Sequence, residues 1–116
     1  MVSQEEEIQM ILKQIEDYYG FVPKIFQELQ HNPEAFKAHF YKTLQLQADR
    51  ALPDLTKELI AIGSAAAGGT EHCLSTHIKV ARQMGAPDDQ ILLAILIGAA
   101  VTETAALSKS LRVWRQ

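Results

Sequence analysis

The chain has 116 residues, with 11 Lys and Arg against 14 Asp and Glu and a formal net charge of −3. Apolar residues make up 47% of it, which is typical of soluble globular domains and excludes a disordered chain. The length suits one core, so we predict a single domain over residues 1–116. The acidic balance argues against nucleic acid or an anionic membrane surface as a partner.

The start of the chain, its longest apolar run and its single cysteine all favour a cytoplasmic location. Residues 1–14 are rich in acids, unlike a signal peptide, and the longest apolar run, residues 91–101, is too short to cross a bilayer. We therefore expect no membrane partner. Cys73 is the only cysteine, so an intramolecular disulfide is impossible and a reducing, cytoplasmic location is expected.

Helix signals open the chain. Ser3 with Glu6 fits a capping box, and Gly20 is suited to end the helix that this box begins. Proline then marks two further helix starts, at Pro23 and at Asn32-Pro33. We predict N-terminal helices within residues 1–50.

Core helices that carry the sequence motifs are predicted within residues 54–112. A fourth helix is expected to run from about Asp54 until Gly68-Gly69 breaks the chain. Thr70 then stands where the N-cap of a fifth helix belongs, and Gly85 is suited to follow its last turn.

The last helical region opens at Asp88 or Asp89, and Gly98 is expected to bend or interrupt it. Residues 91–97 are apolar all round, which predicts full burial, either in the core of the chain itself or partly under a neighbouring subunit. Small residues at 61–67 let a neighbouring backbone approach closely, in the core or across subunits. No segment alternates as a strand does, so the predicted fold class is all-α, a bundle of about six helices.

The strongest chemical signal is the segment Thr70-Glu71-His72-Cys73-Leu74-Ser75-Thr76-His77. With Thr70 as the N-cap, Cys73 lies in the first turn, where free N–H groups and the helix dipole favour thiolate over thiol. His77 lies one turn further on, about 40° around the helix, so its imidazole can reach the sulfur. A carboxylate at Glu58, on the preceding helix, can orient or protonate His77.

Each of these residues also has a purely structural interpretation. A lone cysteine in a helix is usually a small buried hydrophobe, Glu58 suits a first turn as a solvated acid, and His72 is expected to be exposed. Zinc ligation by Cys73, His77 and either His72 or Glu58 is disfavoured, because the two histidines lie about 140° apart around the helix. We expect no metal and no cofactor.

Four segments, in this order, resemble the carboxymuconolactone decarboxylase family, which includes alkylhydroperoxidase D. They are GFVPKIF at 20–26 with NPE at 32–34, LTKELIA at 55–61, GG at 68–69 with EHC at 71–73 and His77, and GA at 85–86 with DDQI at 88–91. The resemblance implies an alkylhydroperoxidase D-like helical bundle that assembles as a homotrimer or homohexamer.

The redox-active branch of that family carries a glutamate ahead of a Cys-x-x-Cys, and a histidine one turn after it. The matching positions here are Glu58, His72 between the two cysteine positions, Cys73 as the second cysteine, and His77. Thr70 stands in place of the first cysteine. An internal disulfide cannot form, so a redox cycle would need an external thiol.

The leading hypothesis is thiol-dependent, peroxiredoxin-like reduction of a peroxide, an oxidoreductase activity. Its catalytic residues would be Cys73 as nucleophile, His77 as base, Glu58 as proton relay and His72 as a supporting polar group.

Two alternatives stay open. One is a cofactor-free lyase acting on a carboxylated lactone, in which Glu58 and His77 do acid–base work. Such a substrate calls for converging cations, and Lys57, Lys79 and Arg82 lie nearby in the sequence. The other is a non-catalytic oligomeric binding protein.

Overall fold

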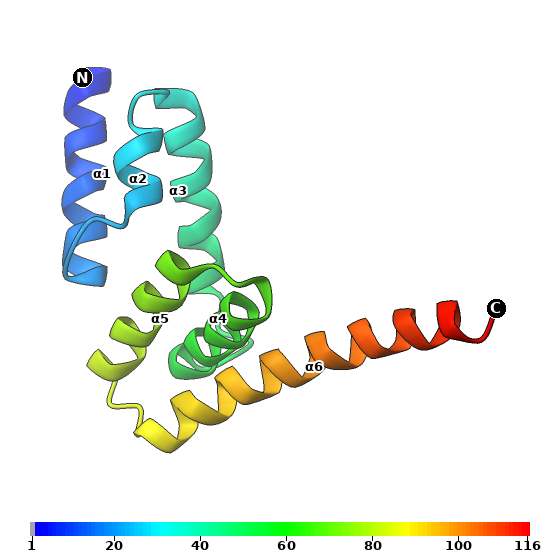
Figure 1. Ribbon diagram of the computed structural model, residues 1–116. Helices are drawn as coiled ribbons and strands as arrows, with labels where there is room; N and C mark the ends of the chain where they lie inside the picture. Colours follow the sequence, from blue (N-terminus) through cyan, green and yellow to red (C-terminus); the bar gives the residue numbers. More distant parts are fainter. Residues whose placement is uncertain (1) are drawn as a thin grey trace. The chain divides into compact units, whose positions relative to one another are not determined.

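The computed structural model describes residues 2–116, and their fold is all-α, as predicted (Figure 1). The chain forms two compact units, one ending at Pro53 and the other running from Asp54 to Gln116. The helices are α1 (Gln4–Tyr19), α2 (Lys24–Leu29), α3 (Pro33–Ala48), α4 (Asp54–Gly68), α5 (Glu71–Gln83) and α6 (Asp88–Trp114).

In the first unit, the predicted helix signals act at the predicted places. The Ser3 hydroxyl accepts a hydrogen bond from the Glu6 amide at 3.1 Å, and Gly20 ends α1 with a φ of 83°. Asn32 caps α3 through its side-chain oxygen. Pro23 lies one position earlier than expected, as the N-cap of α2. The core of this unit is built from aliphatic and aromatic side chains: Ile8, Ile11, Ile15, Tyr19, Phe26, Phe36 and Phe40.

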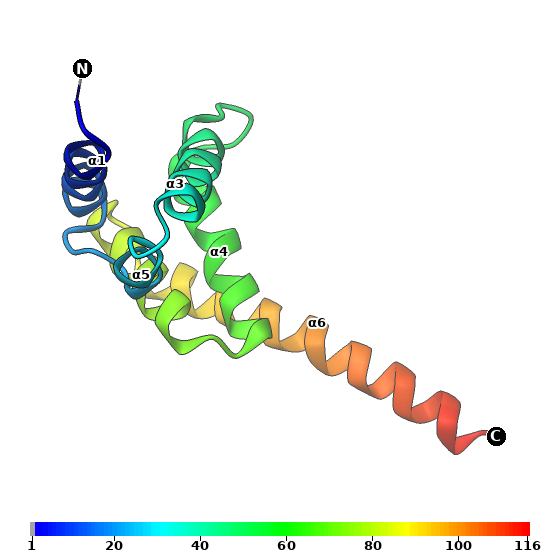
Figure 2. The ribbon, with the colours of Figure 1, turned by 90° about the horizontal axis from the view of Figure 1, so that it is seen from above.

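In the second unit, α4 packs against both α5 and α6 (Figure 2). Gly69 turns the chain between α4 and α5 with a φ of 67°, a conformation that suits glycine. Ile62, Ala81 and Ile91 form the buried centre of this unit, one from each helix. This packing fixes which faces of α4 and α5 meet, and so positions the residues of the candidate site.

The prediction that Gly98 bends or interrupts the last helix is wrong, because α6 runs unbroken through it. Gly98 is buried where α6 crosses α4, and a Cβ there would overlap the carbonyl oxygen of Gly63. A Cβ at Gly63 would in turn lie 3.2 Å from the Ala94 carbonyl oxygen. The glycines therefore allow two helix backbones to approach closely, as the small residues at 61–67 suggested.

Full burial of residues 91–97 is also wrong for the chain by itself. Ile91 is buried against α4, but four neighbours are more than half exposed: Leu92, Leu93, Leu96 and Ile97. By length and composition alone, α6 could cross a membrane. The prediction that no segment is long enough considered only the apolar run at 91–101, which is shorter than the apolar part of the helix. The core helix of a soluble protein passes the same test. The outer face of α6 is thus an apolar surface that this chain leaves uncovered.

Candidate functional site

An acid–base pair joins α4 to α5. The Glu58 carboxylate oxygen Oε1 lies 2.9 Å from Nδ1 of His77. Glu58 is 5% exposed, and the His77 side chain is 26% exposed. The interpretation of Glu58 as a solvated first-turn acid is therefore wrong: the contact of α4 with α5 buries its side chain.

The hydrogen bond with Glu58 determines which ring nitrogen of His77 carries the proton. An ionised carboxylate can only accept, so Nδ1 of His77 donates to Glu58. In the neutral imidazole this leaves Nε2 free to accept a proton. A carboxylate that holds one ring nitrogen in this way orients the ring and stabilises the imidazolium formed when the other nitrogen is protonated. The pair is thus arranged as a general base with a fixed tautomer.

Burial makes this pair dependent on both of its members. Glu58 is the buried charged residue in the part of the chain that the structure describes. Taking a carboxylate out of water is costly unless it is paired and hydrogen-bonded, and His77 supplies that partner. A buried ion pair often adds little to the stability of a fold. Buried, paired titratable groups are common at functional sites, so the burial of Glu58 is consistent with a chemical role.

Cys73 lies in the first turn of α5 and is exposed. The interpretation of this cysteine as a small buried hydrophobe is therefore wrong. Thr70 is the N-cap residue, as predicted, but its side chain does not cap the helix. Its hydroxyl donates instead to the Ala65 carbonyl at 3.4 Å, so the first-turn N–H groups beside Cys73 donate no hydrogen bond to this side chain. His77 follows one turn later along the same face of α5.

His72 is exposed in the same turn, as expected from its position. The helical rotation of about 140° between positions 72 and 77 directs it away from the Glu58–His77 pair. Within residues 2–116, no three side chains of His, Cys, Asp or Glu lie close enough together to hold a metal ion.

Two of the three cations predicted for a polycarboxylate substrate have acidic neighbours. Lys57 lies 3.3 Å from the Asp54 carboxylate on α4, and Arg82 lies 3.5 Å from Asp88. Lys79 is exposed on α5. The acidic partners lower the positive potential that Lys57 and Arg82 could offer to a substrate.

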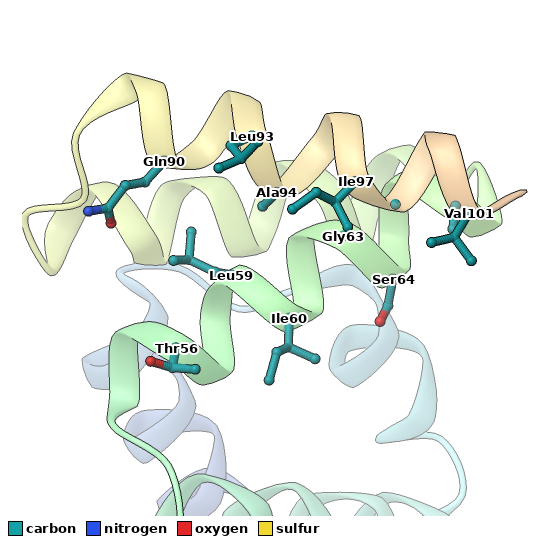
Figure 3. Close-up of a pocket in the computed structure, with 12 residues that line it drawn as sticks. Thr56, Leu59, Ile60, Gly63, Ser64, Gln90, Leu93, Ala94, Ile97 and Val101 are labelled. Carbon is teal, nitrogen blue, oxygen red and sulfur yellow. The ribbon is translucent and has the colours of Figure 1, made fainter. Parts of the chain in front are cut away.

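A groove between α4 and α6 was not predicted from the sequence (Figure 3). It has a volume of about 510 Å³, and its walls are largely apolar, with Leu59, Ile60 and Ala67 on one side and Leu93, Ile97 and Val101 on the other. The signal that could have revealed it is the combination of small residues on α4 with an apolar run on α6 that has too few neighbours to bury it.

Comparison with known proteins places these features in a wider group. The model of the carboxymuconolactone decarboxylase family matches residues 31–116, a range that includes all of α4, α5 and α6. A protein of Paracoccus denitrificans described as "Uncharacterized protein 4 in cox locus" is 41% identical over 59 residues, which are 51% of this chain and 53% of that protein. The match thus spans about half the length of the relative. No solved structure gives a significant match.

Proposed function

Since the chain belongs to the carboxymuconolactone decarboxylase family, we propose that it reduces peroxides with Cys73 as the nucleophile. The observation that supports this most is the buried Glu58–His77 pair, one helical turn from an exposed thiol. A thiol with a neighbouring base that is itself held by a third group has the general arrangement of an activated nucleophile.

The first step is attack of the Cys73 thiolate on one oxygen of a peroxide, ROOH. The S–O bond forms as the O–O bond breaks, giving a sulfenic acid on Cys73 and an alkoxide that takes a proton to become ROH. His77 acts at both ends of this step: Nε2 removes the thiol proton and returns it to the leaving oxygen. Glu58 stabilises the imidazolium in between. His72, exposed next to Cys73 in the first turn of α5, supplies a supporting polar group beside the thiol and not at the Glu58–His77 pair.

Thr70 determines how the sulfur is restored. With a hydroxyl in place of a second thiol, the sulfenic acid must react with an external thiol, forming a mixed disulfide and releasing water. A second external thiol then attacks that disulfide, returning Cys73 as a thiol and leaving the reductant as its own disulfide. The overall reaction converts one peroxide and two thiols into one alcohol, one water and one disulfide of the reductant.

We make three further proposals, two from composition and one, the oligomeric state, from the family resemblance. The protein works in the cytoplasm, where thiol reductants are available. It assembles as a homotrimer or homohexamer, and it uses neither nucleic acid nor a membrane as a partner.

A cofactor-free lyase acting on a carboxylated lactone is the second candidate. One observation favours it: the hydrogen bond between Glu58 and His77 is complete without the thiol, so the pair can serve as an acid–base unit by itself. Its weakness is electrostatic, because Lys57 and Arg82 are paired with acids.

The test is brief exposure of the native protein to a peroxide with a sulfenic-acid trap, followed by intact-mass measurement. We expect one adduct, located on Cys73, and none on Cys73→Ser. Ser75→Ala, which alters another exposed position of α5, is the matched control and should form the adduct as the native protein does. His77→Ala should slow adduct formation by about 10²-fold, the usual contribution of a general base.

Three results would overturn the proposal. Peroxide turnover that persists in Cys73→Ser removes the nucleophile. Lactone turnover that survives Cys73→Ala but is lost in His77→Ala supports the lyase instead. A thiol that stays inert to peroxide and to alkylating reagents in the folded protein indicates a binding protein without catalysis.

A further inference from the structure

A cavity lies within the first unit, between α1 and α3. Its volume is about 220 Å³, and Phe26 of α2 contributes to its wall. The buried part of the wall is made of apolar and aromatic side chains: Ile15, Tyr19, Phe26 and Phe40. Three of these four side chains carry rings. The first unit therefore holds an aromatic-lined cavity that the chemistry proposed for α4 and α5 does not use.

Two side-chain contacts set the spacing of α1 and α3 around the cavity. Near the starts of the two helices, the Lys37 ammonium lies 3.8 Å from the Glu7 carboxylate. Near their ends, the Gln47 side-chain amide donates a hydrogen bond to the Tyr19 hydroxyl at 3.1 Å. The two helices therefore run in the same direction, as Figure 1 shows. Tyr19 and Gln47 both line the cavity, so this hydrogen bond fixes its walls before a ligand binds.

The volume and the rings together limit what the cavity can hold. An engineered apolar cavity of about 150 Å³ is large enough to bind benzene. A volume of about 220 Å³ therefore suits one aromatic ring with one or two small substituents. Aromatic walls favour such a ring, because offset and edge-to-face contacts between rings add to the free energy gained from burying apolar surface.

The more exposed part of the wall is polar but uncharged. It includes Gln14, Thr43 and Gln47, and among residues 2–116 none that lines the cavity carries a charge at neutral pH. An ionised ligand would leave its charge unpaired against such walls, so they favour a neutral ligand.

Thr43 indicates which polar group the ligand carries. Its hydroxyl donates to the His39 carbonyl at 2.9 Å, so the Thr43 proton is already used and the Thr43 oxygen can only accept from a ligand. A ligand that pairs with Thr43 must therefore supply a donor. A hydroxyl group on the ring is the simplest donor that leaves the ligand neutral.

We propose that this cavity binds a neutral phenol of one ring. The ring packs against Tyr19, Phe26 and Phe40, and the phenol hydroxyl donates to the Thr43 oxygen. This is a ligand site in the first unit, and it goes beyond the peroxide reduction proposed at Cys73.

The first test locates the binding site. The native protein, with its isoleucine methyl groups labelled with ¹³C, is titrated with 4-methylphenol and followed by NMR. Ile15 reports on the cavity, whereas Ile60 and Ile97 report on the groove between α4 and α6. We expect a saturable shift of the Ile15 methyl, with a Kd of about 1 mM or below, as suits a ligand of so few atoms.

Two results of this titration overturn the proposal. One is a larger shift at Ile60 and Ile97 than at Ile15, because the ligand would then be binding to exposed apolar surface. The other is no saturable shift of Ile15 up to about 10 mM ligand.

The second test removes the acceptor. Thr43→Val keeps a branched side chain of similar size and should weaken binding of 4-methylphenol about fivefold, the usual contribution of one neutral hydrogen bond. Binding of toluene, which lacks the hydroxyl, should not change. Thr104→Val is the matched control, since the exposed Thr104 hydroxyl also donates to a carbonyl four residues earlier, that of Ala100 at 3.0 Å. It should change neither affinity, and an equal loss for both ligands in Thr43→Val, or no loss for either, overturns the proposal.

The third test adds a charge to the ligand. The 4-methylbenzoate anion has the same ring and methyl group, and it should bind at least about tenfold more weakly than 4-methylphenol because the cavity offers it no cation. Equal or tighter binding of the anion overturns the proposal. None of these measurements depends on Cys73 chemistry, so failure here is distinct from failure of the proposed peroxide reduction.

Discussion

The packed centre of the second unit and its exposed margins differ in what fixes their side chains. At the centre, where α4 meets α5 and α6, Glu58 is held by a partner on another helix, and Gly98 by the backbone of α4. At the margins, Cys73 in the first turn of α5 and the outer half of α6 are exposed. In our proposal, the acid–base pair is therefore preorganised by packing, whereas the thiol depends on what approaches from outside.

Gly98→Ala should give the largest loss of stability. Alanine normally stabilises a helix interior by about 1 kcal/mol relative to glycine. Here the added methyl would overlap the Gly63 carbonyl oxygen and lie 2.8 Å from its carbon, so the two helices must separate. We expect a net loss of about 3 kcal/mol in the free energy of unfolding, measured by urea denaturation.

Gly63→Ala is the matched control for that crossing. Its methyl would lie 3.2 Å from the Ala94 carbonyl oxygen, a tight contact that a small shift relieves, so the net change should stay within about 1 kcal/mol. Equal losses in the two variants would mean that the backbones do not approach closely at Gly98.

Glu58→Ala should have the next largest effect. It leaves the His77 Nδ1–H without its acceptor and opens a void between α4 and α5. A loss of about 2 kcal/mol in the free energy of unfolding is expected, in the middle of the range for an unpaired polar group, because water can partly replace the acceptor of the partly exposed His77 ring. Glu58→Gln keeps an acceptor oxygen and should lose about half as much. A loss that is no smaller for glutamine would show that charge, not hydrogen bonding, holds the pair.

Local signals in the sequence predicted most of the fold. Ser3, Gly20 and Asn32 act through contacts with residues a few positions away, so their roles are visible in the sequence. The prediction for Gly98 was wrong because its role depends on Gly63, which lies on another helix. A glycine that allows close approach cannot be distinguished, in one sequence, from a glycine that breaks a helix.

The candidate site divides in the same way. The positions of Cys73 and His77 in α5 followed from helical spacing, while the Glu58–His77 contact required knowing which face of α4 meets α5. The full burial predicted for residues 91–97 failed because apolar composition reports that a surface needs cover, and not which chain provides it.

Cys73→Ser should have the smallest effect on the free energy of unfolding, in contrast to Glu58→Ala. An exposed side chain that fills no core loses little on conservative replacement, so the free energy of unfolding should change by less than about 0.5 kcal/mol. The same substitution should abolish the peroxide-induced adduct, while Glu58→Ala lowers both stability and the rate of adduct formation. A loss above about 1 kcal/mol in Cys73→Ser would place the sulfur in the packed centre and make it a structural residue.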